Sequence, residues 1–352
     1  MKAIILVLCL LVLGCGSVAD APQDQGDYET TPLAALMYLW FGFDLDTGAS
    51  IGGLGSSHWN TDIGSFNSRV GITDEPVYGF YESDDPAVIA QQLGDMEDAG
   101  IDTILVSWHG WGDRDFNGSI DDKEMEAMDR ALTALLDYIT STNAPFKVIV
   151  LVEPFMLDVP GLTLVNKQLI LDRLFDNFYD VYPTLMFQWE TKPLIVTWAS
   201  LDLKEPADSR FTIKSWGSVA DPNWKVNTTQ DWNWYPDVDL VEGNISDDGM
   251  ITVFPRYDEY WGTIMGMVLG YDFRRVDPLL EDGVYEQTWQ IVADNRSAIN
   301  LILLYSWNEL GEHAAIEPDK GISPVSYGYT LVEITAASYR QFLAGQNIAI
   351  RD

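Results

Sequence analysis

The chain has 352 residues, of which 47% are hydrophobic, so it is long enough for two average domains or one large α/β barrel. Its 54 acidic and 20 basic residues give a formal net charge of −34. A chain this acidic repels phosphate backbones, so the composition argues against nucleic acid as a partner.

Residues 1–15 have the pattern of a lipoprotein-type signal peptide. Lys2 precedes an apolar stretch, Ala3–Leu13, that is too short to span a bilayer, and the stretch ends in Val-Leu-Gly-Cys at Cys15. This ending resembles a lipobox, so we expect an exported cell-surface lipoprotein that touches the membrane only through a lipid on Cys15. Cleavage near Ala21, which would release a secreted protein, is the alternative.

Cys9 and Cys15, the only cysteines of the sequence, both lie in the predicted signal peptide. The rest of the chain is therefore expected to be held by packing and not by disulfides. Residues 16–32 are acidic and contain few apolar side chains, which predicts a flexible tether. Residues 33–352 show no linker, so they are expected to form a single domain.

Apolar strands alternate with amphipathic helices along that domain. The predicted strands are Leu33–Phe41, Ile101–Trp108, Phe146–Glu153, Pro193–Ala199, Phe211–Trp216, Met250–Pro255 and Leu301–Trp307. The predicted helices are Pro86–Ala99, Asp122–Ser141, Leu164–Tyr182, Tyr285–Ser297 and Val332–Leu343. The first is expected to be capped by Asp84-Asp85-Pro86 and to end at Gly100. The alternation predicts the α/β class, as a single (β/α)8 TIM-type barrel with long βα loops. No GxGxxG follows the first strand, so a dinucleotide fold is disfavoured and no organic cofactor is expected.

The last predicted strand ends in a cluster of polar and aromatic side chains. After the apolar run come Trp307, Asn308, Glu309, Glu312 and His313. Desolvating a carboxylate without a partner costs several kcal/mol, so two acids at the end of a buried strand favour a catalytic pair. Capping of the next helix by either acid is the alternative, and the spacing alone leaves both open.

Residues 113–124 fit the template of a calcium-binding loop at every defined position. The predicted ligands are Asp113, Asp115, Asn117, Ser119 through its carbonyl, Asp121 and Glu124, with Gly118 at the turn. The loop follows a strand instead of a helix, so we expect a structural Ca²⁺ and not a sensor. An Asp/Gly-rich turn without an ion is the alternative.

Tryptophan is abundant, with 13 residues, and five of them fall in polar segments: Trp59, Trp111, Trp224, Trp232 and Trp234. Sugar rings present C–H faces that stack on indoles, while nearby polar groups bind their hydroxyls. Such a distribution favours a carbohydrate groove, although any single Trp is more often a core residue.

Several short motifs, taken together and in order, resemble glycoside hydrolase family 99, which comprises endo-α-mannosidases and endo-α-mannanases. They are Tyr38–Gly42, His58–Asn60, Asp62–Gly64, Gly79–Pro86, Ala99–Asp102, Val106–Trp108, Glu153–Phe155, Trp307–Glu309, Glu312 and Ile316–Pro318. The order and approximate spacing agree over about Ala34–Pro318, and the resemblance implies a (β/α)8 barrel and a retaining glycosidase.

The resemblance also implies roles for individual residues. Glu309 would be the base that deprotonates the 2-hydroxyl of the sugar, and Glu312 would be the general acid/base. Glu153 would match a sugar-binding acid of the family. With these three we predict contacts to an oligo- or polysaccharide from Tyr38, Trp40, His58, Trp59, Asn60, Trp108, His109, Trp232, Trp234, Asn308 and His313.

Three departures from the family pattern concern the surroundings of the acids. The family's usual Trp-His-Glu-Gly is Leu310–His313 here, its Trp-Trp-Gly is Trp108–Gly110, and its His two residues before the Glu-Pro acid is Leu151. These changes put mannose specificity in doubt and leave the paired acids in place. A glycan-binding surface lipoprotein without activity and a sugar transferase or phosphorylase are therefore kept as alternatives.

Overall fold

A computed structural model describes residues 31–43, 75–113, 116–120, 122–153, 162–198, 201–217, 231–233, 245–258, 275–276, 284–310, 314–320 and 328–350. The predicted signal peptide and nearly all of the tether lie outside these residues. None of the helices within these ranges has the length and apolar content needed to cross a membrane.

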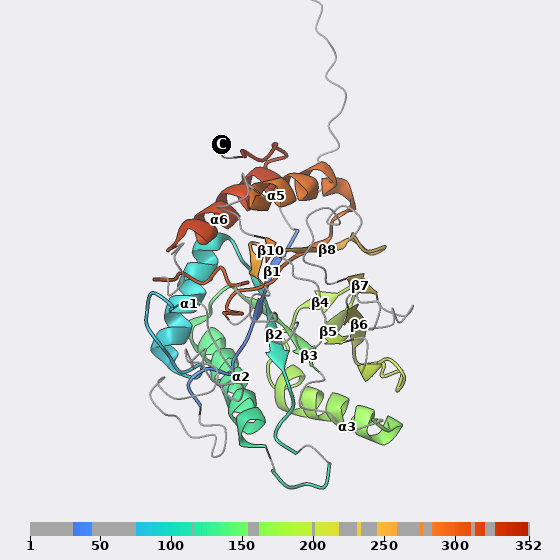
Figure 1. Cartoon of the computed structure of the whole chain (residues 1–352). Helices are drawn as coiled ribbons and strands as arrows, with labels where there is room; N and C mark the ends of the chain where they lie inside the picture. Colours follow the sequence, from blue (N-terminus) through green and yellow to red (C-terminus); the bar gives the residue numbers. More distant parts are fainter. Residues whose placement is uncertain are drawn as a thin grey trace, which may run out of the picture.

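The centre of the molecule is a curled sheet in which the first and last long strands pair (Figure 1). Its parallel strands are β1 (Leu33–Met37), β2 (Thr103–Trp108), β3 (Lys147–Val152), β5 (Lys192–Trp198), β6 (Thr212–Gly217), β7 (Trp232–Asn233), β8 (Met250–Val253) and β11 (Leu301–Leu304). Their order is β7-β6-β5-β3-β2-β1-β11-β8. Every neighbouring pair in that order is parallel. From β1 to β7 the parallel strands lie side by side in the order of the chain, as expected when a crossover connects each parallel strand to the next.

Two short strand pairs add to this sheet. β4 (Gln188–Trp189) pairs antiparallel with β5, and β9 (Tyr257–Asp258) pairs antiparallel with β10 (Arg275–Val276). The described residues contain no backbone pairing of β7 with β8, the two ends of the parallel order. A side-chain contact links β7 to the turn that precedes β8, because Trp232 Nε1 donates to Asp248 Oδ1 over 2.9 Å.

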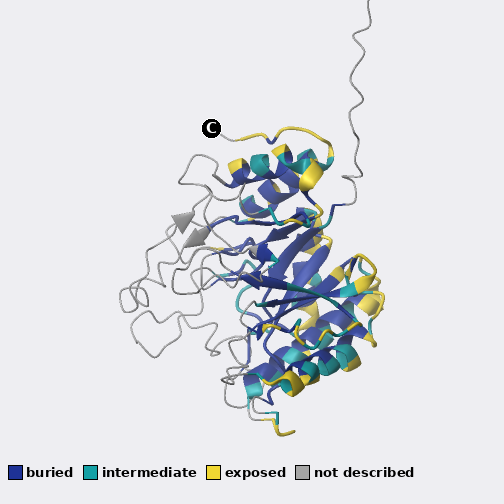
Figure 2. Ribbon diagram, turned by 90° about the vertical axis from the view of Figure 1, so that its right-hand side faces the viewer, coloured by how far each residue is buried: buried dark blue, intermediate teal, exposed yellow. Residues whose placement is uncertain are grey.

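The alternation of side chains along the strands separates two hydrophobic cores. Ile104 and Val106 of β2 pack with the helices in one core, whereas Leu105 packs with residues of the opposite face, such as Leu36 and Leu303. Successive side chains of a strand point to opposite faces, so both faces of the sheet are covered. Figure 2 shows the buried strands at the centre, with helices above and below them that are exposed on their outer sides.

Helices surround the outer face of the sheet. They are α1 (Pro86–Ala99), α2 (Lys123–Thr142), α3 (Leu164–Leu174), α5 (Val284–Asp294) and α6 (Thr330–Leu343), with a 3₁₀ turn at Arg296–Ala298. The predicted caps of α1 are confirmed: Asp85 Oδ1 accepts from Ala87 N over 2.8 Å, and Gly100 takes a left-handed φ of 83° after the last turn.

The helix predicted over Leu164–Tyr182 is confirmed as far as Tyr179, but its second half has a different form. The regular helix ends at Leu174 and continues as a π-helix, Phe175–Tyr179, in which Asp180 N donates to Phe175 O over 2.9 Å. Tertiary contacts stabilise this wider turn, since Tyr179 donates its hydroxyl proton to Leu194 O over 2.7 Å and the Arg210 guanidinium lies 4.7 Å from the Phe175 ring centroid.

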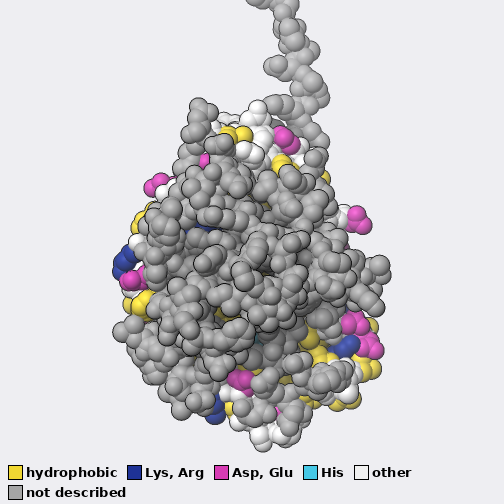
Figure 3. Space-filling model, viewed as in Figure 1, with side chains coloured by type: hydrophobic (Ala, Val, Ile, Leu, Met, Phe, Trp, Pro, Cys, Tyr) yellow, Lys and Arg dark blue, Asp and Glu magenta, His cyan; other side chains and the backbone are white. Residues whose placement is uncertain are grey.

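The acidic composition is visible on the described surface. In Figure 3, Asp and Glu side chains appear around the edge of the molecule, with few Lys and Arg side chains between them. This distribution agrees with the net charge of −34.

Candidate active site

Four neighbouring strands bring polar side chains to one edge of the sheet. Tyr38, His109 and Glu153 follow β1, β2 and β3, and Glu309 follows β11 by a few residues. Because these strands are parallel and adjacent, their carboxyl ends meet at the same edge. This edge is where α/β barrels carry their chemistry, so it is the candidate active site.

Glu153 is the centre of a buried polar group at this edge. Only 4% of the residue is exposed, and Ser107 Oγ donates to its Oε1 over 2.7 Å. With that proton used, Ser107 can accept from His109 Nε2, which lies 3.0 Å from its Oγ and 4.0 Å from Glu153 Oε2. The imidazole, the hydroxyl and the carboxyl therefore form one connected unit.

Burial has a direct effect on the protonation of Glu153. Loss of water raises the pKa of its carboxyl to about 7, against the opposing hydrogen bonds from Ser107 and the Trp198 indole. A carboxyl with such a pKa can accept a hydrogen bond or donate one near neutral pH. It is therefore suited to binding a sugar hydroxyl.

Aromatic rings extend from β1 toward this unit. Trp40 is partly exposed, stacks on Tyr38 at 4.2 Å between ring centroids and meets the His109 ring edge-on at 5.7 Å. The Tyr38 hydroxyl lies 3.4 Å from that of Tyr305, at the end of β11. These contacts bring together Tyr38, Trp40, His109 and Glu153, four of the residues that the sequence predicts to bind substrate.

Glu309 lies in a tight turn after β11. Its backbone N–H donates to Ser306 Oγ over 2.7 Å, its carbonyl accepts from Ala314 N over 3.0 Å, and 7% of the residue is exposed. The chain after the turn comes back to its start, since Glu317 N donates to Trp307 O over 2.8 Å. Residues 311–313, which include Glu312 and His313, lie outside the described residues, as do His58, Trp59, Asn60 and Trp234.

Asn308 has a different role from the predicted contact with substrate. Its Oδ1 accepts from Tyr38 N over 2.8 Å, and its Nδ2 donates to Tyr38 O over 2.9 Å and to the Tyr81 hydroxyl over 3.2 Å. The residue has no exposed surface. Its amide therefore joins the ends of β1 and β11, and this backbone contact replaces the predicted binding role.

Two of the predicted tryptophans are packing residues. Trp108 lies in the core between sheet and helices, where its Nε1 donates to Asp129 Oδ1 of α2 over 3.0 Å. Trp232 belongs to β7, packs edge-on against Trp189 at 5.5 Å and donates to Asp248. Each residue is 1% exposed. For both, burial of the ring replaces the predicted contact with substrate.

Several residues of this edge were not predicted as site residues. They are Ser107, Trp198 and Tyr305, which contact Glu153 or Tyr38. Ser107 stands two positions before His109, so strand alternation would have placed both on one face. For Trp198 and Tyr305 the usable signal is their position at the ends of two apolar strands.

In the described part of residues 113–124, backbone amides of the loop donate to the Asp113 carboxylate. Asp113 Oδ1 accepts from Asn117 N over 3.0 Å, Asp113 Oδ2 accepts from Gly118 N over 2.8 Å, and Gly118 has a φ of 88°. Glu124 is buried in the first turn of α2. Within the described ranges no three His, Cys, Asp or Glu side chains are grouped closely enough for a metal, and two predicted ligands, Asp115 and Asp121, lie outside those ranges.

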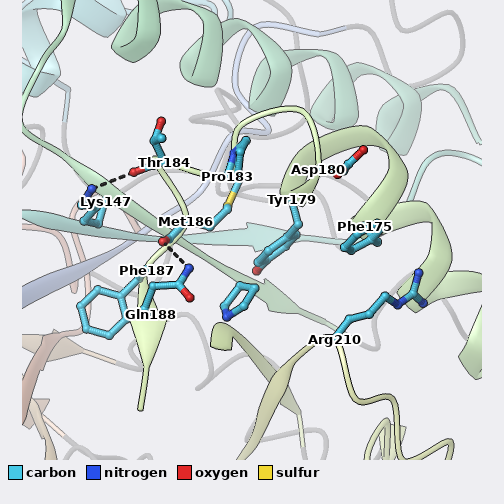
Figure 4. A pocket seen from close by; sticks show the side chains of 11 residues that line it. Lys147, Phe175, Tyr179, Asp180, Pro183, Thr184, Met186, Phe187, Gln188 and Arg210 are labelled. Atoms are coloured by element: carbon cyan, nitrogen blue, oxygen red, sulfur yellow. Dashed lines mark hydrogen bonds between the residues drawn. The ribbon is translucent and has the colours of Figure 1, made fainter. Parts of the chain in front are cut away.

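A cavity of about 840 Å³ lies at the opposite end of the sheet (Figure 4). Its lining includes Lys147 and Pro193, near the amino ends of β3 and β5, together with Tyr179 and Arg210. Because the candidate acids lie at the carboxyl ends of the strands, this cavity does not belong to the candidate active site.

The comparisons with known proteins rest on structure. The chain matches no protein-family model and no curated protein. Two structures of the GH99 endo-alpha-mannosidase from Bacteroides thetaiotaomicron, one in complex with Bis-Tris-propane, match with a TM-score of 0.60 at 15% and 16% identity, over 89% of this chain and 98% of theirs. A glycoside hydrolase-like protein matches with a TM-score of 0.57 at 12% identity, over 88% of this chain and 94% of that one. The predicted resemblance to glycoside hydrolase family 99 is thus confirmed at the level of the fold.

Proposed function

We propose that this protein is a retaining glycoside hydrolase that cleaves an oligo- or polysaccharide through Glu309 and Glu312. The observation that carries the proposal is the convergence of Glu309 and the buried Ser107–His109–Glu153 unit on adjacent strand ends. The similarity of fold to the GH99 endo-alpha-mannosidase supports it. An α-mannoside-like glycan, cut within the chain, is the proposed substrate class.

The proposed barrel closes by the approach of β7 to β8. The eight parallel strands, with β1 next to β11, lie in the order expected of a (β/α)8 barrel. The Trp232–Asp248 hydrogen bond links β7 to the turn that precedes β8, which supports closure at this seam.

The proposed reaction has two steps. The Glu309 carboxylate takes the proton of the sugar 2-hydroxyl, O2 attacks C1, and the bond from C1 to the leaving oxygen breaks as Glu312 protonates that oxygen. In the second step Glu312 removes a proton from water, the water oxygen attacks C1, and the C1–O2 bond breaks as Glu309 returns the proton to O2. Two inversions at C1 give net retention.

Glu153 is proposed to hold the reacting sugar. Its carboxyl lies beside His109, and Trp40 contacts the same imidazole ring edge-on, so a polar group and an aromatic face adjoin. This pairing suits a pyranose ring, whose hydroxyls need hydrogen bonds and whose C–H face needs an apolar surface.

A glycan-binding protein without hydrolytic activity is the second candidate. The sequence Leu310–His313 around the second acid differs from the family's Trp-His-Glu-Gly, which removes a donor and an aromatic wall near that acid. Such changes reduce turnover more than affinity when they affect the transition state alone.

Digestion of a panel of α-mannans and other surface polysaccharides tests this proposal. We expect new reducing ends, with the newly formed product retaining its anomeric configuration in the first NMR spectra. Glu312→Gln should remove hydrolysis and preserve binding of the same oligosaccharide. Binding by the unmodified protein without any cleavage would instead support the second candidate.

Two further proposals concern the ion and the membrane. The residues proposed to hold a structural Ca²⁺ are Asp113, Asp115, Asn117, Ser119, Asp121 and Glu124. The hydrogen bonds of Asp113 to the amides of residues 117 and 118 support this loop geometry.

We also propose export and lipidation at Cys15, on the basis of the lipobox-like Val-Leu-Gly-Cys that ends at this residue.

A further inference from the structure

A second buried acid, Glu317, lies behind the turn that carries Glu309. It is 1% exposed and accepts three hydrogen bonds. Tyr78 and Gln92 donate to its Oε1 over 2.8 and 2.7 Å, and Tyr81 donates to its Oε2 over 3.1 Å. Gln92 belongs to α1, so the carboxyl links this helix to the segment that precedes it.

Tyr81 connects Glu317 to the candidate site. Its hydroxyl donates to Glu317 and accepts from Asn308 Nδ2 over 3.2 Å. Asn308 in turn holds both backbone polar groups of Tyr38 and directly precedes Glu309. An unbroken line of hydrogen bonds therefore runs from α1 to the end of β1 and to the turn of Glu309.

The contact between Tyr81 and Glu317 determines which group donates in the next hydrogen bond, between Tyr81 and Asn308. The Tyr81 hydroxyl has one proton, and Glu317 as acceptor orients that proton away from Asn308. The oxygen of Tyr81 is then free to accept from Nδ2, which leaves Oδ1 of Asn308 facing Tyr38 N. The two hydrogen bonds with the Tyr38 backbone orient the Asn308 amide, and the carboxyl at position 317 keeps the Tyr81 oxygen available as a further partner of that amide, which lies beside the candidate catalytic base.

Tyr78 provides an internal comparison. It donates to the same carboxyl as Tyr81, but in the described part of the chain its hydroxyl has no hydrogen bond to Asn308. Loss of either hydroxyl removes one donor from Glu317. Only loss of the Tyr81 hydroxyl also removes the contact with Asn308.

We propose that Glu317 is a positioning residue which, through Tyr81 and Asn308, fixes the end of β1 and the turn that carries Glu309. The effect of Glu317 on catalysis rests on the proposed glycosidase function. Its effect on how firmly the end of β1 is held does not. Glu317 itself is one of the residues behind the site and has no part in the bond-breaking steps.

The test compares Tyr81→Phe with the matched control Tyr78→Phe in the full chain. Hydrogen–deuterium exchange reports on the Tyr38 amide, which donates to Asn308 Oδ1. We expect Tyr81→Phe to speed exchange in peptides that contain Tyr38 by about tenfold, the effect of roughly one lost hydrogen bond, and Tyr78→Phe to leave it within twofold. Equal exchange in the two variants would overturn the proposal.

Hydrolysis of the glycan found in the digestion screen is the second readout. Tyr81→Phe should lower kcat about tenfold with little change in KM, and Tyr78→Phe should retain the unmodified kcat. If both variants lose kcat alike, Glu317 only stabilises the fold. If the unmodified protein cleaves no glycan and exchange still responds to Tyr81→Phe alone, the glycosidase proposal fails and the positioning role stands.

Discussion

At the scale of single residues, the buried acids Glu153 and Glu317 have the same electrostatic character. Loss of water raises the pKa of Glu153 and of Glu317 to about 7, and hydrogen-bond donors offset only part of that effect. Each acid therefore remains protonated in the folded chain at pH values where it would be ionised in the unfolded chain. Asp208 behaves in the opposite way, because hydrogen bonds from Arg210 lower its pKa to about 2.

This difference predicts how stability depends on pH. Between pH 4.5 and about 7 the folded state holds more protons than the unfolded state, so the free energy of unfolding falls as pH rises. The stabilisation is complete below pH 4.5 and is lost above the folded pKa, with a magnitude on the order of 3 kcal/mol for each group. The contribution of Asp208 is lost only at lower pH, so it does not affect this window.

Urea unfolding at pH 5 and pH 7.5 measures the effect. Glu317→Gln removes one of the described carboxyls whose pKa is raised to about 7, so the variant should lose less stability than the unmodified chain between these values. Glu97→Gln, an exposed change on the same helix that Gln92 belongs to, should behave like the unmodified chain. An equal loss in Glu317→Gln and the unmodified chain would show that burial does not shift this acid.

At the scale of elements, the two ends of α1 were the most predictable features. Asp85 and Gly100 were predicted as caps of α1 because the Asp85 side chain reaches an amide two residues away and glycine readily adopts the left-handed backbone after a last helical turn, and both predictions are confirmed. The π-helix after α3 and the short strands β4 and β7 were not predicted. Their causes are contacts from distant segments, such as Tyr179 with Leu194, which no local pattern encodes.

The loop of residues 113–124 makes a prediction about an element, because it leads directly into α2. Asp122 caps that helix by accepting from Met125 N over 3.0 Å, and Glu124 lies in its first turn. Calcium held by Glu124 and the loop should therefore stabilise the start of α2. We expect added Ca²⁺ to raise the melting temperature by a few degrees and a chelator to reverse it.

Variants in the first turn of α2 separate this site from nonspecific cation effects. Glu124→Gln should abolish the calcium response, and Glu126→Gln, which changes an acid paired with Lys123 in the same turn, should preserve it. An unmodified chain whose melting temperature is insensitive to both Ca²⁺ and chelator would contradict the calcium proposal.

At the scale of the whole molecule, the candidate site depends on pairings between distant parts of the chain. The sequence placed Glu153 and Glu309 correctly at strand ends, since apolar runs followed by acids are local signals. It did not indicate that Asn308 would bind the Tyr38 backbone, 270 positions away, or that Trp108 would turn to the helices. Those outcomes depend on which strands become neighbours, and the pairing of β1 with β11 decides that.

We propose that the carboxyl edge of this sheet is a glycosidase site, and we assign Glu309 as its base. The most direct test of this assignment is the rate of glycan hydrolysis by Glu309→Gln, a change of one atom at the carboxyl, beside Glu97→Gln as the exposed control. This assignment predicts that Glu309→Gln loses about a thousandfold in kcat while it binds the oligosaccharide as tightly as the unmodified protein, and that Glu97→Gln loses neither. Hydrolysis by Glu309→Gln at the unmodified rate would contradict it.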